Sequence, residues 1–457
     1  MSTVDPAAAA QFVRDRLPQG GLFAGHHWRV SPEPFPLDPT LAGELETLGR
    51  VLHQFYRAVN LLYRQSVSGQ QPAWVAAWLD QGKPAPLIAL QRDPAFKNAV
   101  PRVIRPDLLL TESGLALVEL DSVPGGIGLT AWLNQTYAEL AAASGDRKPE
   151  TDFAGAILGG PDGMKRGFAG IFGAAPQVHI VVSEEAATYR PEMEWLAAQL
   201  GNQRFQVRDA QFTGFADGDA VYRFFELFDL PHVPQAEAIF QMARSGQLRL
   251  TPPPKPLFEE KMLFALLWNR NLRDFWRREL GEGFLQRLQR IVPYSWLVDP
   301  APLPPQAAIP ELHLTDWRQL KNLSQRERAL VLKISGFSEL AWGSRGVFIG
   351  HDLSQAEWSA AVDQALASFP QSPYVLQRYQ KPRRIDFSWF DFSRNLLTPM
   401  PGRIRLCPYY FITGEGDAAR ANLGGVLATI CPDDKKIIHG MSEAILAPCS
   451  VASNELV

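Results

Sequence analysis

Cysteine is scarce in this sequence, with three residues in 457, Cys407, Cys431 and Cys449, all near the end of the chain. They are odd in number and lack a CxxC spacing, which argues against a disulfide scaffold or a zinc knuckle and favours a reducing compartment. No apolar run approaches the roughly 20 residues that span a bilayer. The first residues also lack the basic start and long apolar stretch of a signal peptide. We therefore expect a cytoplasmic protein without a membrane segment.

An excess of charge of either sign is also missing. The formal net charge is −3, and the basic residues are scattered along the chain, so electrostatics predicts neither nucleic acid nor an anionic membrane as a partner. The content of 46% hydrophobic and 20% charged residues is typical of a folded globular protein. A chain of 457 residues is too long for one ordinary core, so we expect two or three subdomains.

Several catalytic and nucleotide-binding motifs are absent as well. The sequence contains no G-x-x-x-x-G-K-[ST], which excludes a P-loop, and no G-x-S-x-G, which is the nucleophile elbow of α/β-hydrolases. No Ser-His-Asp or Cys-His set can be singled out, and the lone His439 is interpreted as structural. The function must therefore be sought in other residues.

The periodicity of apolar residues predicts an α+β protein. Asp38-Pro39 reads as the capped start of a helix, because apolar residues then recur at spacings of three and four up to Leu62. Strand and helix patterns alternate from 178 to 225, which predicts a small parallel α/β unit. Strand patterns with one helix follow a proline-rich stretch near 305. We expect three parts: residues 1–175, 176–255 and 256–457.

Two carboxylates end an apolar strand in "GLALVELDSVPGGIG". Glu119 and Asp121 are two residues apart, so they point to one face, and a hairpin turning at 111–114 can place Asp107 opposite Glu119. Three acids on one face repel each other unless a cation lies between them, and Mg²⁺ with a bound phosphate suits such a set. The alternative is a solvated hairpin rim with a glycine turn. Under the metal interpretation, the glycines at 125–128 let the backbone approach a ligand.

Basic residues in three places are candidates for contacts with phosphate. Arg105 shares the side of Asp107 and is able to hold an anionic group through two hydrogen bonds. Lys333 ends an apolar strand before a glycine loop, an arrangement that several folds close over ATP phosphates. Arg345 in that loop is available for developing phosphate charge. Lys261 is a candidate too, although a surface lysine on a helix is the simpler interpretation.

Two further features belong to this nucleotide hypothesis. The loop after Lys333 contains Gly336, Gly343 and Gly346. The strand pattern "YVLQRYQKP" carries Gln377 and has the character of a wall against an adenine, although any strand end reads the same way.

Taken together, these residues resemble the glutathionylspermidine synthase family, which has a circularly permuted ATP-grasp fold. The spacing of the arginine and the three acids is similar to that family's arginine and metal-ligand set. "DAVYRFFELFDL", "TPPPKPLFEEKMLFALLW" and "LKISG" followed by "GSRGV" are similar to further family segments, in the same order over residues 100–440. The resemblance implies an ATP-grasp-like core with an additional small parallel α/β (pre-ATP-grasp-like) unit.

The resemblance also implies roles for individual residues. Asp107, Glu119 and Asp121 would bind Mg²⁺, and Arg105 would contact the phosphates or an acyl phosphate. Lys261 and Lys333 would hold ATP phosphates. The closing loop would supply Arg345, and Gln377 would lie near the adenine.

Three departures from the family pattern stand out. Asp121 takes the place of the usual Asn, and "FSELAW" is inserted before "GSRG". The family's late arginine has no clear match, with Arg403, Arg405 and Arg420 as candidates. Residues 1–100 contain no cysteine, so the amidase domain is absent, and glutathione and spermidine are not implied as substrates.

The resulting expectation is an ATP- and Mg²⁺-dependent ligase that joins a small-molecule carboxylate to an amine through an acyl phosphate. It would release ADP and phosphate. Two alternatives remain open: a small-molecule kinase on the same fold, and a non-catalytic protein that binds a nucleotide or a partner. An oligomer is compatible with the sequence.

Overall fold

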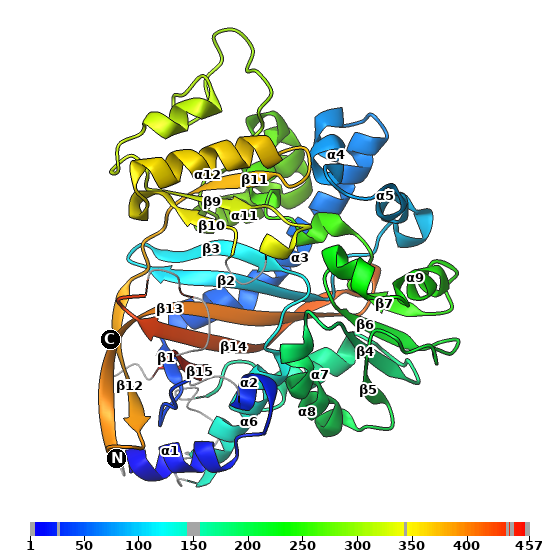
Figure 1. Cartoon of the computed structure of the whole chain (residues 1–457). Coiled ribbons are helices and arrows are strands. Elements are labelled where there is room, and N and C mark those ends of the chain that lie inside the picture. Colours follow the sequence, from blue (N-terminus) through cyan, green and yellow to red (C-terminus); the bar gives the residue numbers. More distant parts are fainter. Residues whose placement is uncertain are drawn as a thin grey trace.

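Figure 1 shows a computed structural model of the chain, which describes residues 5–24, 28–143, 156–341, 345–435, 438 and 443–452. Within these ranges the protein is a mixed α+β structure with three sheets. The same ranges contain no helix with both the length and the apolar character needed to cross a membrane.

The largest sheet has seven strands and is built from both ends of the chain. Its order is β1-β15-β14-β13-β2-β3, with β12 paired to β13. Only the β1–β15 pair is parallel, so the sheet is mixed. The strands are β1 (Phe35–Leu37), β2 (Val103–Thr111), β3 (Gly114–Asp121), β12 (Arg384–Asp391), β13 (Leu396–Thr413), β14 (Arg420–Pro432) and β15 (Ile445–Val451).

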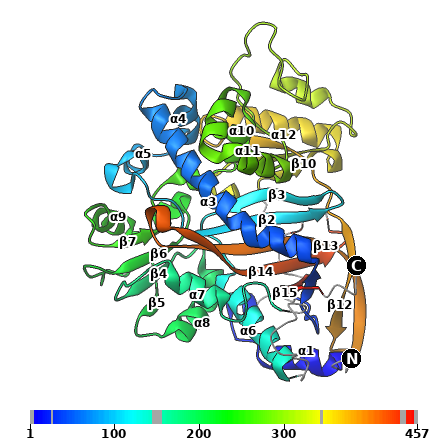
Figure 2. The ribbon, with the colours of Figure 1, turned by 180° about the vertical axis from the view of Figure 1, so that it is seen from behind.

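Helices cover both faces of this sheet. The long helix α3 (Pro39–Val67) crosses one face (Figure 2), and α6 (Ile127–Ala143) and α7 (Gly163–Gly170) pack on the other. The predicted start of α3 is confirmed, because the Asp38 carboxylate accepts hydrogen bonds from the amides of Thr40 and Leu41 at 2.7 and 3.1 Å. Alternation along β2 and β13 decides which side chains meet α3: Ile104 and Tyr410 join its core, and Tyr409 faces the opposite side.

The predicted parallel α/β unit is present. Its sheet has the order β5-β4-β6-β7 with every pair parallel, and it lies to the right of the large sheet in Figure 1. Its elements are β4 (Val178–Val182), α8 (Arg190–Leu200), β5 (Phe205–Arg208), β6 (Ala220–Phe224), α9 (Ala236–Arg244) and β7 (Arg249–Thr251).

An antiparallel four-stranded sheet, called the second sheet below, lies beside the β2–β3 hairpin (Figure 1). Its order is β10-β9-β11-β8, and α12 (Gln355–Ser368) packs against it, so the strands and helix expected after residue 329 are confirmed. The strands are β8 (Ser295–Leu297), β9 (Leu330–Ile334), β10 (Val347–Ile349) and β11 (Tyr374–Arg378). The remaining helices are α1 (Pro6–Asp15), α2 (Gly21–Ala24), α4 (Ala73–Asp80), α5 (Ala85–Arg92), α10 (Leu263–Trp268) and α11 (Arg273–Ile291).

The segment around Lys261 is not helical at Lys261 itself, unlike the interpretation of this residue as a surface lysine on a helix. A short 3-10 turn at Pro256–Glu259 ends before Lys261, and α10 begins only at Leu263. The backbone amide of Lys261 donates to the carbonyl of Ser335 at 2.8 Å instead of to a helical partner. The tertiary contact with the end of β9 therefore overrides the helical pattern of the sequence.

Candidate active site

The β2–β3 hairpin brings three of the predicted acids to one face through a β-bulge. Near the turn, Leu108 pairs with Leu117, but beyond the bulge Asp107 pairs with Glu119. Val118 is the extra residue. In an unshifted register Glu119 would lie opposite Pro106, and its side chain would point to the α3 side of the sheet. The predicted pairing of Asp107 with Glu119 is thus confirmed.

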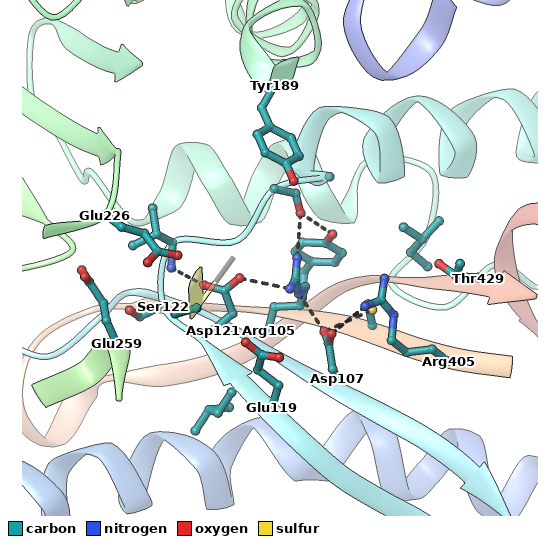
Figure 3. A pocket seen from close by; sticks show the side chains of 18 of the residues that line it. Arg105, Asp107, Glu119, Asp121, Ser122, Tyr189, Glu226, Glu259, Arg405 and Thr429 are labelled. Atoms are coloured by element: carbon teal, nitrogen blue, oxygen red, sulfur yellow. Dashed lines mark hydrogen bonds and ion pairs between the residues drawn. The ribbon is translucent and has the colours of Figure 1, made fainter. Parts of the chain in front are cut away.

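These acids line a cavity of about 210 Å³ together with two arginines (Figure 3). Arg105 lies between two carboxylates, with Nε 3.1 Å from Asp107 Oδ1 and Nη2 3.0 Å from Asp121 Oδ2. On the other side of Asp107, Arg405 Nη1 lies 2.8 Å from Oδ2. The Asp107 side chain is only 6% exposed. A buried carboxylate is therefore held between two guanidinium groups.

Burial and ion pairing act in opposite directions on these groups. Burial alone would lower the pKa of Arg105, but Asp107 and Asp121 raise it well above its ordinary value. Burial raises the pKa of Asp121 despite the nearby Arg105 charge. Burial and the charge of Asp107 raise the pKa of the neighbouring Cys407 thiol to about 12. Cys407 therefore stays protonated near neutral pH, which makes a thiolate nucleophile at this site unfavourable.

Two lysines approach the same hairpin. Lys261 Nζ lies 2.9 Å from Glu119 Oε1, and its side chain is 10% exposed, so Lys261 is not a surface lysine on a helix. Lys333 Nζ donates to the carbonyl of the bulged Val118 at 2.7 Å. Burial lowers the pKa of Lys333 to about 8, with Glu119 opposing that effect and the positive charge of Lys261 adding to it. The bulge at Val118 thus sets the register that pairs Asp107 with Glu119, and its carbonyl accepts a hydrogen bond from Lys333.

A buried network fixes the segment that carries Lys261 against the end of β9. The amide of Met262 donates to Ser335 Oγ at 2.9 Å, and that hydroxyl donates to Glu260, which forms a buried ion pair with Lys83. Gly336 follows directly, and a Cβ there would lie 2.4 Å from the Glu259 carbonyl oxygen. The structure thus gives Gly336 a packing role, and a role in ATP binding stays a prediction.

The glycine turn after β3 meets a helix of the α/β unit, and its Gly125 and Gly126 also line the cavity, so the approach of this backbone to a ligand stays a prediction. The Glu192 carboxylate on α8 accepts from the amides of Gly126 and Leu129 at 2.6 and 2.8 Å. A Cβ on Gly128 would lie 2.1 Å from the Glu192 carbonyl oxygen. Burial raises the pKa of Glu192 to about 7, and the backbone amides oppose that rise. The glycines therefore permit close packing of two units.

The predicted magnesium set appears as an ion-pair network. Asp107 is shared by Arg105 and Arg405, and Lys261 holds Glu119. Within the described ranges, no three His, Cys, Asp or Glu side chains are grouped in a way that could hold a metal ion. In this arrangement the carboxylates do not fit a preformed Mg²⁺ site, because guanidinium and ammonium groups already neutralise them.

Among the described residues, neither Arg345 nor Gly346 is part of the lining of the cavity. Arg345 pairs with Glu185 of the α/β unit at 3.1 Å, and its side chain is 49% exposed. Gly343 lies outside the described residues. Gly346 packs closely, since a Cβ there would be 2.8 Å from the Leu340 carbonyl oxygen. The assignments of Arg345 and the loop glycines therefore stay predictions.

Gln377 lies on β11 and is buried, with its amide nitrogen donating to Ser295 Oγ at 3.0 Å. It pairs with Val331, two residues from Lys333 on β9, so Gln377 and Lys333 point to the same face of the second sheet. The described residues that line the cavity do not include Gln377. Gln377 and Lys333 thus share one face of the second sheet, and neither residue is part of the lining of the cavity.

The structure selects among the three late arginines and adds residues that the sequence did not single out. Of Arg403, Arg405 and Arg420, Arg405 lines the cavity. The alternation in "RIRLCPYY" was a usable signal, because it puts Arg405, Cys407 and Tyr409 on one face of β13. No sequence pattern indicated four further residues that line the cavity: Tyr189, Glu226, Glu259 and Thr429.

No family model and no curated protein matches this chain. Among solved structures, it is similar to a glutathione synthetase-like effector (GSS30) from Globodera pallida in its apo form, with a TM-score of 0.56, 12% identity and 98% of each chain covered. A putative gamma-glutamylcysteine synthetase from Methylobacillus flagellatus KT has a TM-score of 0.38 and 12% identity over 90% of this chain and 89% of its own. The first of these two likenesses shows a shared fold over nearly the whole length of the chain.

Proposed function

We propose that this protein is an ATP-dependent carboxylate–amine ligase with an ATP-grasp-like, circularly permuted core. The observation that carries the proposal is the approach of Lys261, Lys333 and Arg405, from three different parts of the chain, to the hairpin that carries Arg105. Prearranged cations are suited to stabilise the negative charge of a phosphoryl group in transfer. The fold shared with a glutathione synthetase-like effector supports the same reaction class.

In this proposal ATP lies between the second sheet and the hairpin. Lys261 and Lys333 hold the phosphates, and Gln377, on the same face of the sheet as Lys333, marks the direction of the adenine. The loop that carries Arg345 leads back into β10 and closes over the phosphates. Closure excludes water, which would otherwise hydrolyse a reactive intermediate.

The reaction has two steps. A substrate carboxylate attacks the γ-phosphorus of ATP, so that a new O–P bond forms, the bond to the β,γ-bridging oxygen breaks and ADP leaves. An amine then attacks the carbonyl carbon of the acyl phosphate, inorganic phosphate leaves and the amine loses a proton. Arg105 and Arg405 would stabilise the anionic oxygens of the acyl phosphate in both steps.

Mg²⁺ enters this proposal as the ion expected to accompany ATP, where it would neutralise phosphate charge. Glu119 and Asp121, two of the acids that line the cavity, would face it. Because cations pair with the acids in the described arrangement, no step of the reaction is assigned to the metal.

The test is to measure ADP and inorganic phosphate while pools of carboxylates and amines are supplied separately and together. A ligase releases both products in equal amounts only when an acid and an amine are present. A kinase releases ADP without phosphate, which would contradict the proposal. Lys333→Ala should abolish product release, and Lys321→Ala, which removes a surface pair with Asp363, is the matched control.

One observation favours a second candidate, a non-catalytic nucleotide-binding protein. Two arginines already satisfy the charge of Asp107, an arrangement that is stable without a substrate. In that case ATP raises the melting temperature, because it binds the folded state, while no ADP forms with any pool. Repeating the thermal measurement with EDTA shows whether Mg²⁺ contributes to binding.

A further inference from the structure

A second cavity of about 800 Å³ lies away from the candidate active site. It is bounded by α3, the start of β2, the end of β13 and β7 of the α/β unit. Arg102, directly before β2, lines this cavity, whereas Arg105 and Asp107 line the first one. The second cavity is therefore located where the α/β unit meets the α3 side of the large sheet.

Positive charge gathers in this cavity. Four arginines line it: Arg57, Arg64, Arg102 and Arg249. Two acids are also present, but Glu279 accepts a hydrogen bond from Arg278 at 2.8 Å, and Glu415 lies 3.4 Å from Arg102. Arg57 and Arg249 are exposed, so their guanidinium groups are accessible from solvent. The cavity retains a positive balance that the protein's net charge of −3 does not suggest.

Nearby titratable groups respond to this charge. Burial and then the charges of Arg57 and Arg102 lower the pKa of His53, which lines the cavity, to about 4. Burial and Arg64 lower the pKa of Lys255 to about 7. Both effects accompany the geometric clustering of the arginines, and both disfavour additional positive charge at this place.

We propose that the second cavity binds a small organic polyanion through its phosphate or carboxylate oxygens. Guanidinium groups recognise both kinds of oxygen through paired, charge-assisted hydrogen bonds. The volume of about 800 Å³ is within the range of small-molecule sites and exceeds what a single inorganic anion fills. Apolar side chains in the lining, such as Phe172, Leu250 and Ile412, would contact the carbon part of the ligand.

Binding would also connect two parts of the protein. Arg249 belongs to β7 of the α/β unit, and Arg57 belongs to α3. A single polyanion that contacts both would hold the α/β unit against the large sheet. The site would thus stabilise the junction of these two parts without touching the residues proposed for catalysis.

The experiment is isothermal titration of the full-length protein with pyrophosphate, citrate and fructose 1,6-bisphosphate. We expect binding that weakens as ionic strength rises, because the contacts are electrostatic. Arg57→Gln and Arg249→Gln should each raise the Kd about tenfold, as expected for the loss of one charge-assisted contact. Both side chains are exposed, so neither change should prevent folding.

Two controls make the result decisive. Arg50→Gln alters an exposed arginine two turns away on α3, outside the cavity lining, and should change the Kd less than about twofold. Lys333→Ala removes a lysine beside the β2–β3 hairpin, outside the lining of the second cavity, and should leave polyanion binding intact. The proposal is overturned if none of the three anions binds at millimolar concentration, if Arg57→Gln matches Arg50→Gln, or if Lys333→Ala abolishes binding.

Discussion

Replacing Lys333 by Met should stabilise the protein while removing nucleotide binding. The Lys333 side chain is buried at the end of β9, and its pKa is lowered from 10.5 to about 8. At about 1.4 kcal/mol for each pH unit, this difference means that the charged form costs the folded state about 3 kcal/mol near neutral pH. Loss of the hydrogen bond to the Val118 carbonyl offsets about 1 kcal/mol of the gain. The expected net gain in the free energy of unfolding is therefore about 2 kcal/mol.

The sign of the pH dependence follows from the same numbers. Below pH 8 Lys333 is charged in both states, so the full penalty of the wild-type protein is present. Between pH 8 and 10.5 the folded protein releases the proton while the unfolded chain retains it, so wild-type stability rises relative to Lys333→Met. The advantage of the variant should thus shrink across this interval.

Urea unfolding at pH 7 and at pH 9.5 measures this difference directly. Lys321→Met is the matched control, because Lys321 forms a surface pair with Asp363, and its effect should stay within about 0.5 kcal/mol. In the presence of MgATP, Lys333→Met should lose most of the thermal stabilisation seen for the wild type. The reasoning is refuted if Lys333→Met destabilises the protein at pH 7, or if its effect is the same at both pH values.

Three further predictions concern the acids, the late arginine and the contact with the α/β unit. Glu119→Gln should abolish product formation and lower the melting temperature, because Lys261 and Lys333 overcome the effect of burial and lower the pKa of Glu119. Asp121→Asn should retain partial activity without a loss of stability, because burial raises the pKa of the Asp121 carboxyl that this change removes. Arg405→Gln should lower the free energy of unfolding by about 1–3 kcal/mol in a urea titration, because the buried Asp107 carboxylate loses one of its two guanidinium partners. An unchanged urea midpoint would contradict this. The folded-state pKa of Glu192 is raised from 4.5 to about 7. The free energy of unfolding of the wild type, relative to that of Glu192→Gln, should therefore fall by up to about 3 kcal/mol as the pH rises from 4.5 to 7. If the difference between the two proteins does not change with pH, this prediction is wrong.

Local patterns in the sequence were sufficient for the helices and strands that form the frame of the site. The capped start of α3, the turn of the β2–β3 hairpin and the alternating strands of the α/β unit follow from side-chain chemistry and spacing within a few residues. The candidates Arg105, Asp107, Glu119 and Lys261 carried enough local signal to be named, and the structure brings them to one cavity.

Only the tertiary structure decided what these residues face. The bulge at Val118 depends on pairing across the whole hairpin, and a slip of one residue would have turned Glu119 to the other side of the sheet. Arg405 reaches Asp107 from a strand 298 residues later, and Glu192 fills the glycine turn from α8, so local spacing could indicate neither contact. The sequence thus determined which residues can carry charge and which segments form strands. Long-range packing determined that arginines and lysines lie among the acids, because a buried charge is stable only beside a partner that the rest of the fold brings to it.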